Sequence, residues 1–126
     1  MLIDDNQDDN LIHERVIKKA DAARFVVIQE RATDALEYLK AKNLHLDKHP
    51  DLIFLDINMP GMNGWEFLNE YKKLDKELQS QVIVVMLTTS EDPEDKKKAM
   101  QFNMPCDFKT KPLTKEILEE TIEKYC

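Results

Sequence analysis

The sequence predicts an α/β domain in which a parallel sheet is covered by helices on both faces. Three apolar runs are continuous rather than alternating, which is typical of parallel strands that are buried on both sides. They are Phe25–Ile28, Leu52–Leu55 and Val82–Leu87. Apolar residues between these runs recur at helical spacing. Strands and helices therefore alternate along the chain, in an order that indicates five βα units.

The first of these units begins at the first residues of the sequence. Met1–Ile3 predicts a short strand, and Ile12, Val16 and Ala20 recur at the four-residue spacing of a helix after it. The helix after the second run places four apolar residues on one face: Ala32, Ala35, Leu36 and Leu39. Only three residues precede Asp4, so we expect that the first strand begins further upstream in the natural protein.

The later units carry stronger turn and cap signals. Both glycines, Gly61 and Gly64, lie in the loop after the third run, so we expect that loop to need unusual backbone dihedrals. The next helix has four residues expected to pack in the core: Trp65, Phe67, Leu68 and Tyr71. Asp92–Pro93 predicts a helix start, with the proline as the first helical residue. Asp107–Thr110 is a weaker fifth strand, and Thr114 is the expected N-cap of the last helix.

Composition limits the class of protein. A chain of 126 residues that is 42% hydrophobic fits one domain, so we expect residues 1–126 to form it without an output domain. A net charge of -7 argues against direct binding of nucleic acid. The cysteines, Cys106 and Cys126, show no metal-ligand spacing and favour a reducing compartment. No apolar run is long enough to cross a membrane and no secretory signal is recognised, so we expect a cytoplasmic protein.

Polar residues that could carry chemistry follow the predicted strands. In open α/β sheets, sites form at the carboxyl ends of the strands. The residues expected to meet there are Asp4, Asp5, Asp56, Thr88, Thr89, Ser90 and Lys111. Two further acids, Asp8 and Asp9, are interpreted as first-turn helix residues that the helix dipole favours.

This set of side chains predicts a metal-assisted phosphoryl site. Clustered carboxylates repel one another unless a cation lies between them, and oxygen ligands favour a hard cation such as Mg²⁺. A lysine and a hydroxyl on the other side suit a phosphoryl group, whose charge needs several partners. A carboxylate would then be the nucleophile.

Four segments, each at a predicted strand end, resemble those of a known family. They are Leu2–Asn6, Leu55–Gly64, Leu87–Ser90 and Lys111–Pro112. In this order they are similar to the receiver domains of two-component response regulators, and in particular to single-domain, chemotaxis-regulator-like members. The resemblance covers essentially the whole chain. It implies a flavodoxin-like, doubly wound (βα)5 fold with five parallel strands in the order 2-1-3-4-5 and helices on both faces.

The resemblance also implies a role for each matching residue. Asp56 would be the phosphoacceptor, and Mg²⁺ would be held by Asp4, Asp5, Asp56 and the backbone carbonyl of Asn58. Lys111 would pair with the phosphoryl group, and its bond to Pro112 is expected to be cis.

Further roles concern the response to phosphorylation. Thr88 would be the switch hydroxyl that moves toward the phosphoryl group, and Phe108 the aromatic residue that turns inward on activation. Thr89 and Ser90 would tune how long the phosphoryl group lasts.

The implied function is a Mg²⁺-dependent switch that takes a phosphoryl group from a sensor histidine kinase or a phosphotransfer protein. It would promote its own phosphorylation and dephosphorylation without being an enzyme in the ordinary sense. It would signal to an unknown downstream protein as a monomer or weak homodimer, without inserting into a membrane.

Three alternatives remain open at this point. An aspartyl-nucleophile phosphatase would need D-x-D after the first strand, where this chain has Asp4–Asn6. A flavin carrier would need a phosphate loop rich in glycine, serine and threonine, whereas residues 4–9 here would repel a phosphate. A degenerate receiver that serves only as a docking module would lack part of the expected set of side chains.

Overall fold

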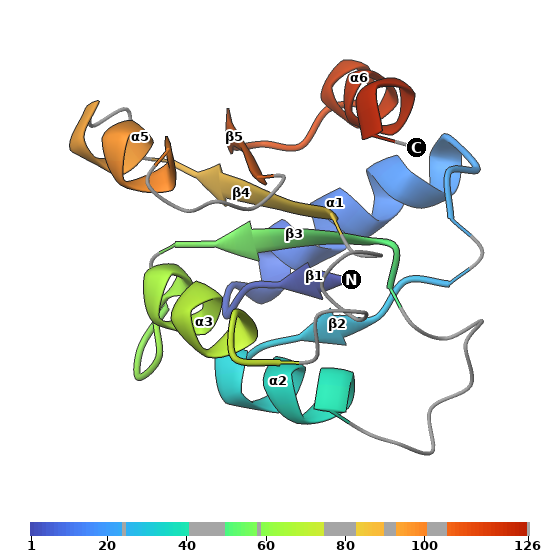
Figure 1. The fold of residues 1–126 in the computed structure, drawn as a ribbon. Coiled ribbons are helices and arrows are strands. Elements are labelled where there is room, and N and C mark those ends of the chain that lie inside the picture. Colours follow the sequence, from blue (N-terminus) through green and yellow to red (C-terminus); the bar gives the residue numbers. More distant parts are fainter. Residues whose placement is uncertain are drawn as a thin grey trace.

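A five-stranded parallel sheet forms the centre of the molecule, with strands in the order β2-β1-β3-β4-β5. Helices lie on both faces of it, as Figure 1 shows for this computed structural model. The structure describes residues 1–23, 25–40, 50–57, 59–74, 83–89, 93–100 and 106–125. The predicted fold class and strand order are therefore confirmed.

Strands and helices alternate from one end of the chain to the other. The strands are β1 (Leu2–Ile3), β2 (Ile28–Gln29), β3 (Leu52–Asp56), β4 (Ile83–Thr88) and β5 (Cys106–Thr110). The described helices are α1 (Gln7–Lys19), α2 (Ala32–Lys40), α3 (Gly64–Tyr71), α5 (Pro93–Met100) and α6 (Lys115–Tyr125). Each strand is thus followed by a helix, as the apolar runs and the helical spacing between them predicted.

Successive side chains of the central strands enter two different core clusters. In β3, Ile53 and Leu55 pack in a cluster with residues of α2 and α3, including the predicted core residues Phe67 and Tyr71. Phe54 lies between them in sequence and packs in the second cluster, which contains residues of α1 and α6. This alternation follows from the period of a strand, and it buries both faces of the sheet.

Side-chain caps fix where two helices begin. The Asn6 side chain accepts hydrogen bonds from the backbone N–H groups of Asp8 and Asp9, so α1 starts at Gln7, after a connection of three residues from β1. Thr114 Oγ1 accepts a hydrogen bond from Ile117 N at 3.2 Å, which confirms it as the cap of α6. Short connections of this kind carry the first helical turn close to the strand ends.

The loop after β3 has the demanding shape that its glycines predicted. A Cβ atom on Gly64 would lie 2.8 Å from the carbonyl oxygen of Asp56 and 2.9 Å from Cα of Ile57. Gly61 has a φ of 77°, in the left-handed region that glycine adopts without strain. The backbone can therefore fold back against the end of β3 only because both positions lack a side chain.

One prediction about local structure is wrong. Phe25 lies outside β2 and is 52% exposed, although Phe25–Ile28 was expected to be a buried strand. Within the described part of the chain, β2 is an edge strand that pairs only with β1, and β1 is two residues long, so the ladder is short. The helical spacing of Ile12 and Val16 corresponds to α1. In this helix Ile12 is 47% exposed, and Asn10, His13 and Ile17 are buried.

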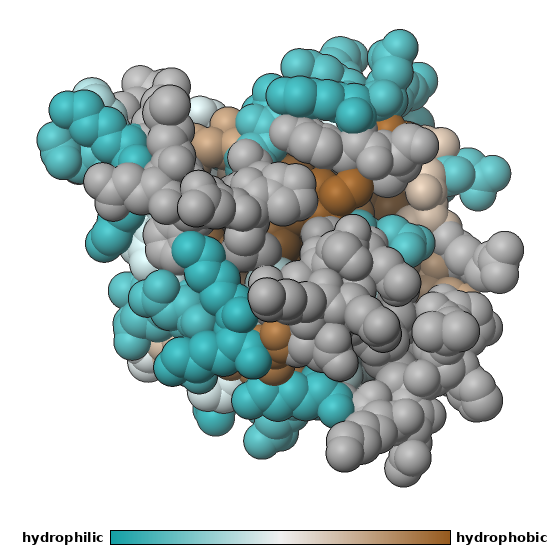
Figure 2. Space-filling view, in the orientation of Figure 1, coloured by the Kyte–Doolittle hydropathy of each residue, from teal (hydrophilic) through white to brown (hydrophobic). Residues whose placement is uncertain are grey.

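The visible described surface is largely hydrophilic. Figure 2 shows hydrophilic residues over the outer sides of α3, α5 and α6, with smaller hydrophobic areas between them. Among the described residues, no helix combines the length and the apolar character that crossing a membrane requires.

Candidate functional site

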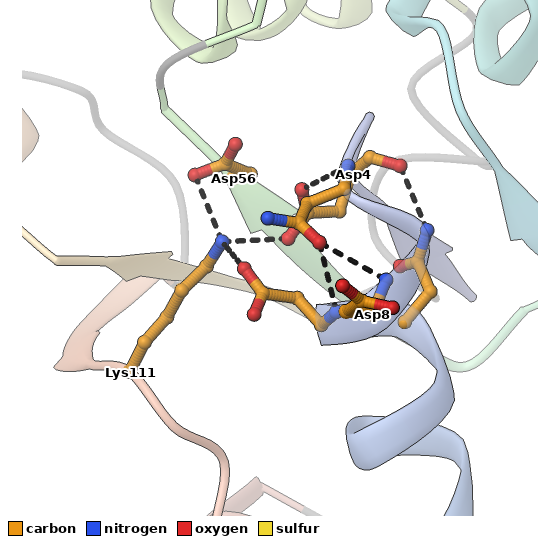
Figure 3. A network of polar contacts seen from close by, with 7 residues as sticks. Asp4, Asp8, Asp56 and Lys111 are labelled. Atoms are coloured by element: carbon orange, nitrogen blue, oxygen red, sulfur yellow. Dashed lines mark hydrogen bonds and ion pairs between the residues drawn. The ribbon is translucent and has the colours of Figure 1, made fainter.

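Four side chains predicted from the sequence lie where the strands end. Asp4 directly follows β1, Asp56 is the last residue of β3, Thr88 is the last residue of β4, and Lys111 directly follows β5. Asp4, Asp56 and Thr88 are buried. Figure 3 shows Asp4, Asp56 and Lys111 pointing toward one another from different elements of the fold. The parallel sheet therefore brings together residues more than 100 positions apart.

Three carboxylates form a group suited to a divalent cation. Asp4, Asp5 and Asp56 each offer an oxygen atom, and these atoms all lie within 4.8 Å of one another. Asp5 is exposed to solvent, whereas the other two are buried. A small, hard cation prefers oxygen donors at this spacing and can keep water ligands on the exposed side. The donor set therefore fits Mg²⁺.

The ammonium group of Lys111 is the positive partner of these acids. Its Nζ atom donates hydrogen bonds to Asp4 Oδ2 at 2.7 Å and to Asp9 Oδ2 at 2.9 Å. The nearest oxygen of Asp56 is 3.4 Å away. Only 9% of the Lys111 side chain is exposed, so these charges interact with little screening by solvent.

The surroundings shift the pKa values of two basic groups. Burial alone would lower the pKa of Lys111, but hydrogen bonds to Asp4 and Asp9 and the charges of Asp4 and Asp56 outweigh it and raise that pKa. Burial and then the charge of Lys111 lower the pKa of His13, against the opposing charges of Asp9 and Asp4. At neutral pH the lysine is therefore charged and the histidine is neutral.

Thr88 and Lys111 are connected through the backbone. The N–H of Lys111 donates a hydrogen bond to the carbonyl oxygen of Thr88 at 2.8 Å, just beyond the β4–β5 ladder. The bond between Lys111 and Pro112 is cis, as expected. Thr89 is exposed. Asn58 and Ser90, which were expected to contribute a metal-binding carbonyl and a tuning side chain, lie outside the described residues.

Phe108 and Thr88 lie on the neighbouring strands β5 and β4. It pairs with Met86 in the β4–β5 register, while Thr88 pairs with Thr110 two positions further along. Side chains two positions apart share a face of the sheet. Phe108 is partly buried and packs against the core cluster that contains Met86 and Trp65. Thr88 and Phe108 therefore lie diagonally from each other on one face of the sheet.

The sequence did not predict the contacts of two residues at the site. Asp9 was interpreted as a first-turn acid, which it is, but its carboxylate also binds Lys111. Asn10 was not singled out, yet its buried side chain donates a hydrogen bond to the carbonyl oxygen of Asp4 at 2.8 Å. Asp9 and Asn10 follow Asp5 by four and five residues, and this proximity in sequence was the available signal.

This arrangement has the parts needed for phosphoryl transfer to a carboxylate. Asp56 offers an oxygen nucleophile, the neighbouring acids can hold a cation beside it, and Lys111 supplies a positive charge within a few ångströms. Catalysis of such transfers depends mainly on positioning and on charge stabilisation.

Comparisons with known proteins agree with this geometry. The family described as "Response regulator receiver domain" matches residues 1–123. Protein PilH of Pseudomonas aeruginosa is 33% identical over 92 residues, which cover 68% of this chain and 74% of PilH. The crystal structure of a two-component response regulator from Cytophaga hutchinsonii superposes with a TM-score of 0.85 at 29% identity, and the match covers 98% of this chain and 92% of that one.

Some relatives are considerably longer than this chain. Sensory transduction protein LytT of Bacillus subtilis is 28% identical over 102 residues, which cover 76% of this chain but 39% of LytT. The similarity to LytT is thus limited to one part of that protein.

Proposed function

This chain belongs to the response regulator receiver domain family of two-component signalling, and on that premise we propose that it is a Mg²⁺-dependent switch phosphorylated on Asp56. This proposal depends mainly on the position of Asp56, which is buried at the end of β3 beside Asp4, Asp5 and Lys111. We also propose that this receiver domain acts in the cytoplasm, as a monomer or weak homodimer.

The phosphoryl donor is proposed to be a phosphohistidine on a sensor histidine kinase or a phosphotransfer protein. One carboxylate oxygen of Asp56 attacks the phosphorus atom, a new P–O bond forms, and the P–N bond to the histidine breaks. The bonding electrons leave with the imidazole nitrogen, which takes up a proton. The product on this chain is an acyl phosphate. Hydrolysis of that bond by water returns the carboxylate and inorganic phosphate.

Residues of this chain prepare Asp56 for that step. Asp4 and Asp5, with Asp56, would hold Mg²⁺, which when bound neutralises negative charge on the incoming phosphoryl group. Lys111 faces the same carboxylate from the side of β5 and pairs with the phosphoryl oxygens. The carbonyl of Asn58 is a further proposed ligand, and Thr89 and Ser90 are proposed to adjust the access of water.

Replacing Asp5 is expected to weaken Mg²⁺ binding. Asp5→Ala removes the exposed ligand of the carboxylate group, and the apparent dissociation constant for Mg²⁺ should rise about tenfold or more. Titration with Mg²⁺, followed by NMR or by Trp65 fluorescence, measures this change. Asp8→Asn removes the same charge from an acid outside the carboxylate group and should change affinity by roughly twofold or less. Equal effects of the two substitutions would refute the assignment of Asp5.

Signalling is proposed to leave the site through Thr88 and Phe108. A phosphoryl group adds about -1.5 to -2 charges and three acceptor oxygens. Lys111 forms an ion pair with the phosphoryl oxygens, and the Thr88 hydroxyl donates a hydrogen bond to them after moving toward them. Because Phe108 shares a face with Thr88 and lies diagonally from it, it moves into the space that Thr88 leaves. The surface of α5, β5 and α6 then changes and is read by a downstream protein.

Thr88→Ala is expected to separate phosphorylation from this response. The substitution removes the hydroxyl but leaves Asp56 and its carboxylate neighbours in place, so phosphorylation should change by only a few fold. Chemical-shift changes at Phe108 and Lys109 on adding beryllofluoride, a stable phosphoryl mimic, should fall to less than about half of those in the wild type. Thr89→Ala serves as the matched control. If the chemical shifts of Phe108 in the wild type do not change when beryllofluoride fully occupies the site, the signal is transmitted through another surface of the protein.

A phosphorylation assay tests the proposed function. The chain is incubated with acetyl phosphate, with and without Mg²⁺, and its intact mass is measured. Transfer of one phosphoryl group, with release of acetate, is expected only when Mg²⁺ is present. Steady release of phosphate from unrelated small esters would instead favour the phosphatase alternative. A chain that binds a kinase but never gains a phosphoryl group would be a docking module.

A further inference from the structure

Asp9 competes for the lysine on which the proposed phosphorylated state depends. Lys111 Nζ donates hydrogen bonds to Asp4 and Asp9, whereas its nearest contact to Asp56 is longer, at 3.4 Å. Figure 3 shows the ammonium group held between the first turn of α1 and the end of β3. In this state the shortest contacts of Lys111 are therefore with Asp4 and Asp9 and not with the phosphoacceptor.

Asp9 is held at this position by the way in which α1 begins. The N–H groups of Asp8 and Asp9 both donate to the Asn6 side chain, at 3.0 and 3.1 Å, which fixes the first turn of the helix. Of these two adjacent acids, only Asp9 forms an ion pair with Lys111. The Asp9 side chain is 30% exposed, so its bond to the buried ammonium is only partly screened.

The hydrogen bonds of Lys111 must be redistributed if Asp56 is phosphorylated. An ammonium group has three protons to donate, and Asp4 and Asp9 accept two of them, so at most one is left for the three oxygens of a phosphoryl group. The oxygens of Asp4 would then also bind the cation, which weakens the hydrogen bond between Asp4 and Lys111. Asp9 is not a member of the carboxylate group that could hold the cation, so a bound cation would leave its hydrogen bond with Lys111 in place. The new phosphoryl oxygens and the Asp9 carboxylate therefore compete for the same donor.

We propose that Asp9 is a positioning residue that holds Lys111 away from the phosphoryl group and so destabilises the phosphorylated state of this switch. This role rests on the proposed phosphorylation of Asp56. Asp9 acts through Lys111 and touches no reacting atom. Its removal frees one donor of the lysine and also takes a negative charge away from an anionic product. Both effects have the same sign, because each favours the phosphorylated form.

Binding of beryllofluoride in the presence of Mg²⁺ tests this role of Asp9. The full chain is titrated as wild type, Asp9→Asn, Asp9→Glu and Asp8→Asn, and the apparent dissociation constant is read from NMR chemical shifts. Asp9→Asn should bind about threefold to tenfold more tightly, since a charged hydrogen bond to Lys111 is lost from the free state. Asp9→Glu retains the carboxylate and should resemble the wild type. Asp8→Asn should change binding by less than about twofold.

Salt separates direct competition from a general effect of charge. At about 1 M salt the Debye length falls to roughly 3 Å, which suppresses the effect of removing a distant carboxylate. The advantage of Asp9→Asn over Asp8→Asn should persist there, because Asp9 contacts the lysine directly. Equal affinities of these two variants, or weaker binding by Asp9→Asn, would overturn the role of Asp9 while leaving the proposed function intact. Failure of the wild-type chain to bind beryllofluoride would overturn both.

Discussion

Asp56→Asn is expected to reduce phosphorylation by about a thousandfold or more, because it removes the nucleophile itself. The amide has nearly the shape of the carboxylate but lacks the negative oxygen that attacks phosphorus. The substitution also removes one of the three acids that group around the proposed metal site. Incubation with acetyl phosphate and Mg²⁺, followed by intact-mass measurement over time, gives the rate of incorporation.

Asp34→Asn is the matched control for this experiment. Asp34 is an exposed acid in the first turn of α2, and its replacement removes the same charge from outside the site. Incorporation by Asp34→Asn should equal that of the wild type. If Asp56→Asn gains phosphate at the wild-type rate, Asp56 is not the acceptor and another residue must be sought.

Lys111→Met is expected to change the affinities for cation and phosphoryl mimic in opposite directions. The ammonium group and Mg²⁺ compete for the oxygens of Asp4, so removing the lysine should tighten Mg²⁺ binding about threefold to tenfold. Beryllofluoride loses its charged donor, and its affinity should fall about tenfold to a hundredfold. Methionine is an unbranched side chain that can fill the space of the lysine stem. Titrations with Mg²⁺ alone and then with beryllofluoride measure both effects.

Lys109→Met shows whether such effects depend on contact with the site. Lys109 lies two residues before Lys111 on β5, and its ion pairs are with Asp107 and Glu120. Both of its measured affinities should stay within about twofold of the wild type. If Lys111→Met shifts the two affinities in the same direction, the lysine does not balance cation and phosphoryl group as proposed.

Much of the fold could be predicted because its signals are local. The apolar runs at Leu52–Leu55 and Val82–Leu87 correspond closely to β3 and β4. The helical spacing of apolar residues predicted the helices between the strands. Parallel strands share one carboxyl edge, so the clustering of Asp4, Asp56 and Lys111 followed from the fold class. The predicted strand at Phe25–Ile28 was too long because the length of β2 depends on pairing with β1, which has two residues. Local sequence does not carry this information.

The role of Asp9 could not be read from sequence for a different reason. Asp8 and Asp9 are chemically identical neighbours, and both suit the first turn of a helix. Which of them faces Lys111 depends on the rotation of α1 about its axis, and the Asn6 cap sets that rotation in the folded chain. The proposed roles of Asn58 and Ser90 remain predictions from the family resemblance, because both lie outside the described residues.

The residue that carries the phosphoryl group can be identified chemically. Borohydride reduces an acyl phosphate at its carbonyl carbon, releases phosphate and converts the aspartate to homoserine. The wild-type chain, phosphorylated with acetyl phosphate in Mg²⁺, is reduced in this way, digested and mapped by mass spectrometry. Homoserine is expected at position 56, and only in the sample treated with both phosphodonor and Mg²⁺. Homoserine at another aspartate, or a phosphoryl group that survives hydroxylamine and stays on a serine or threonine, would contradict phosphorylation on Asp56.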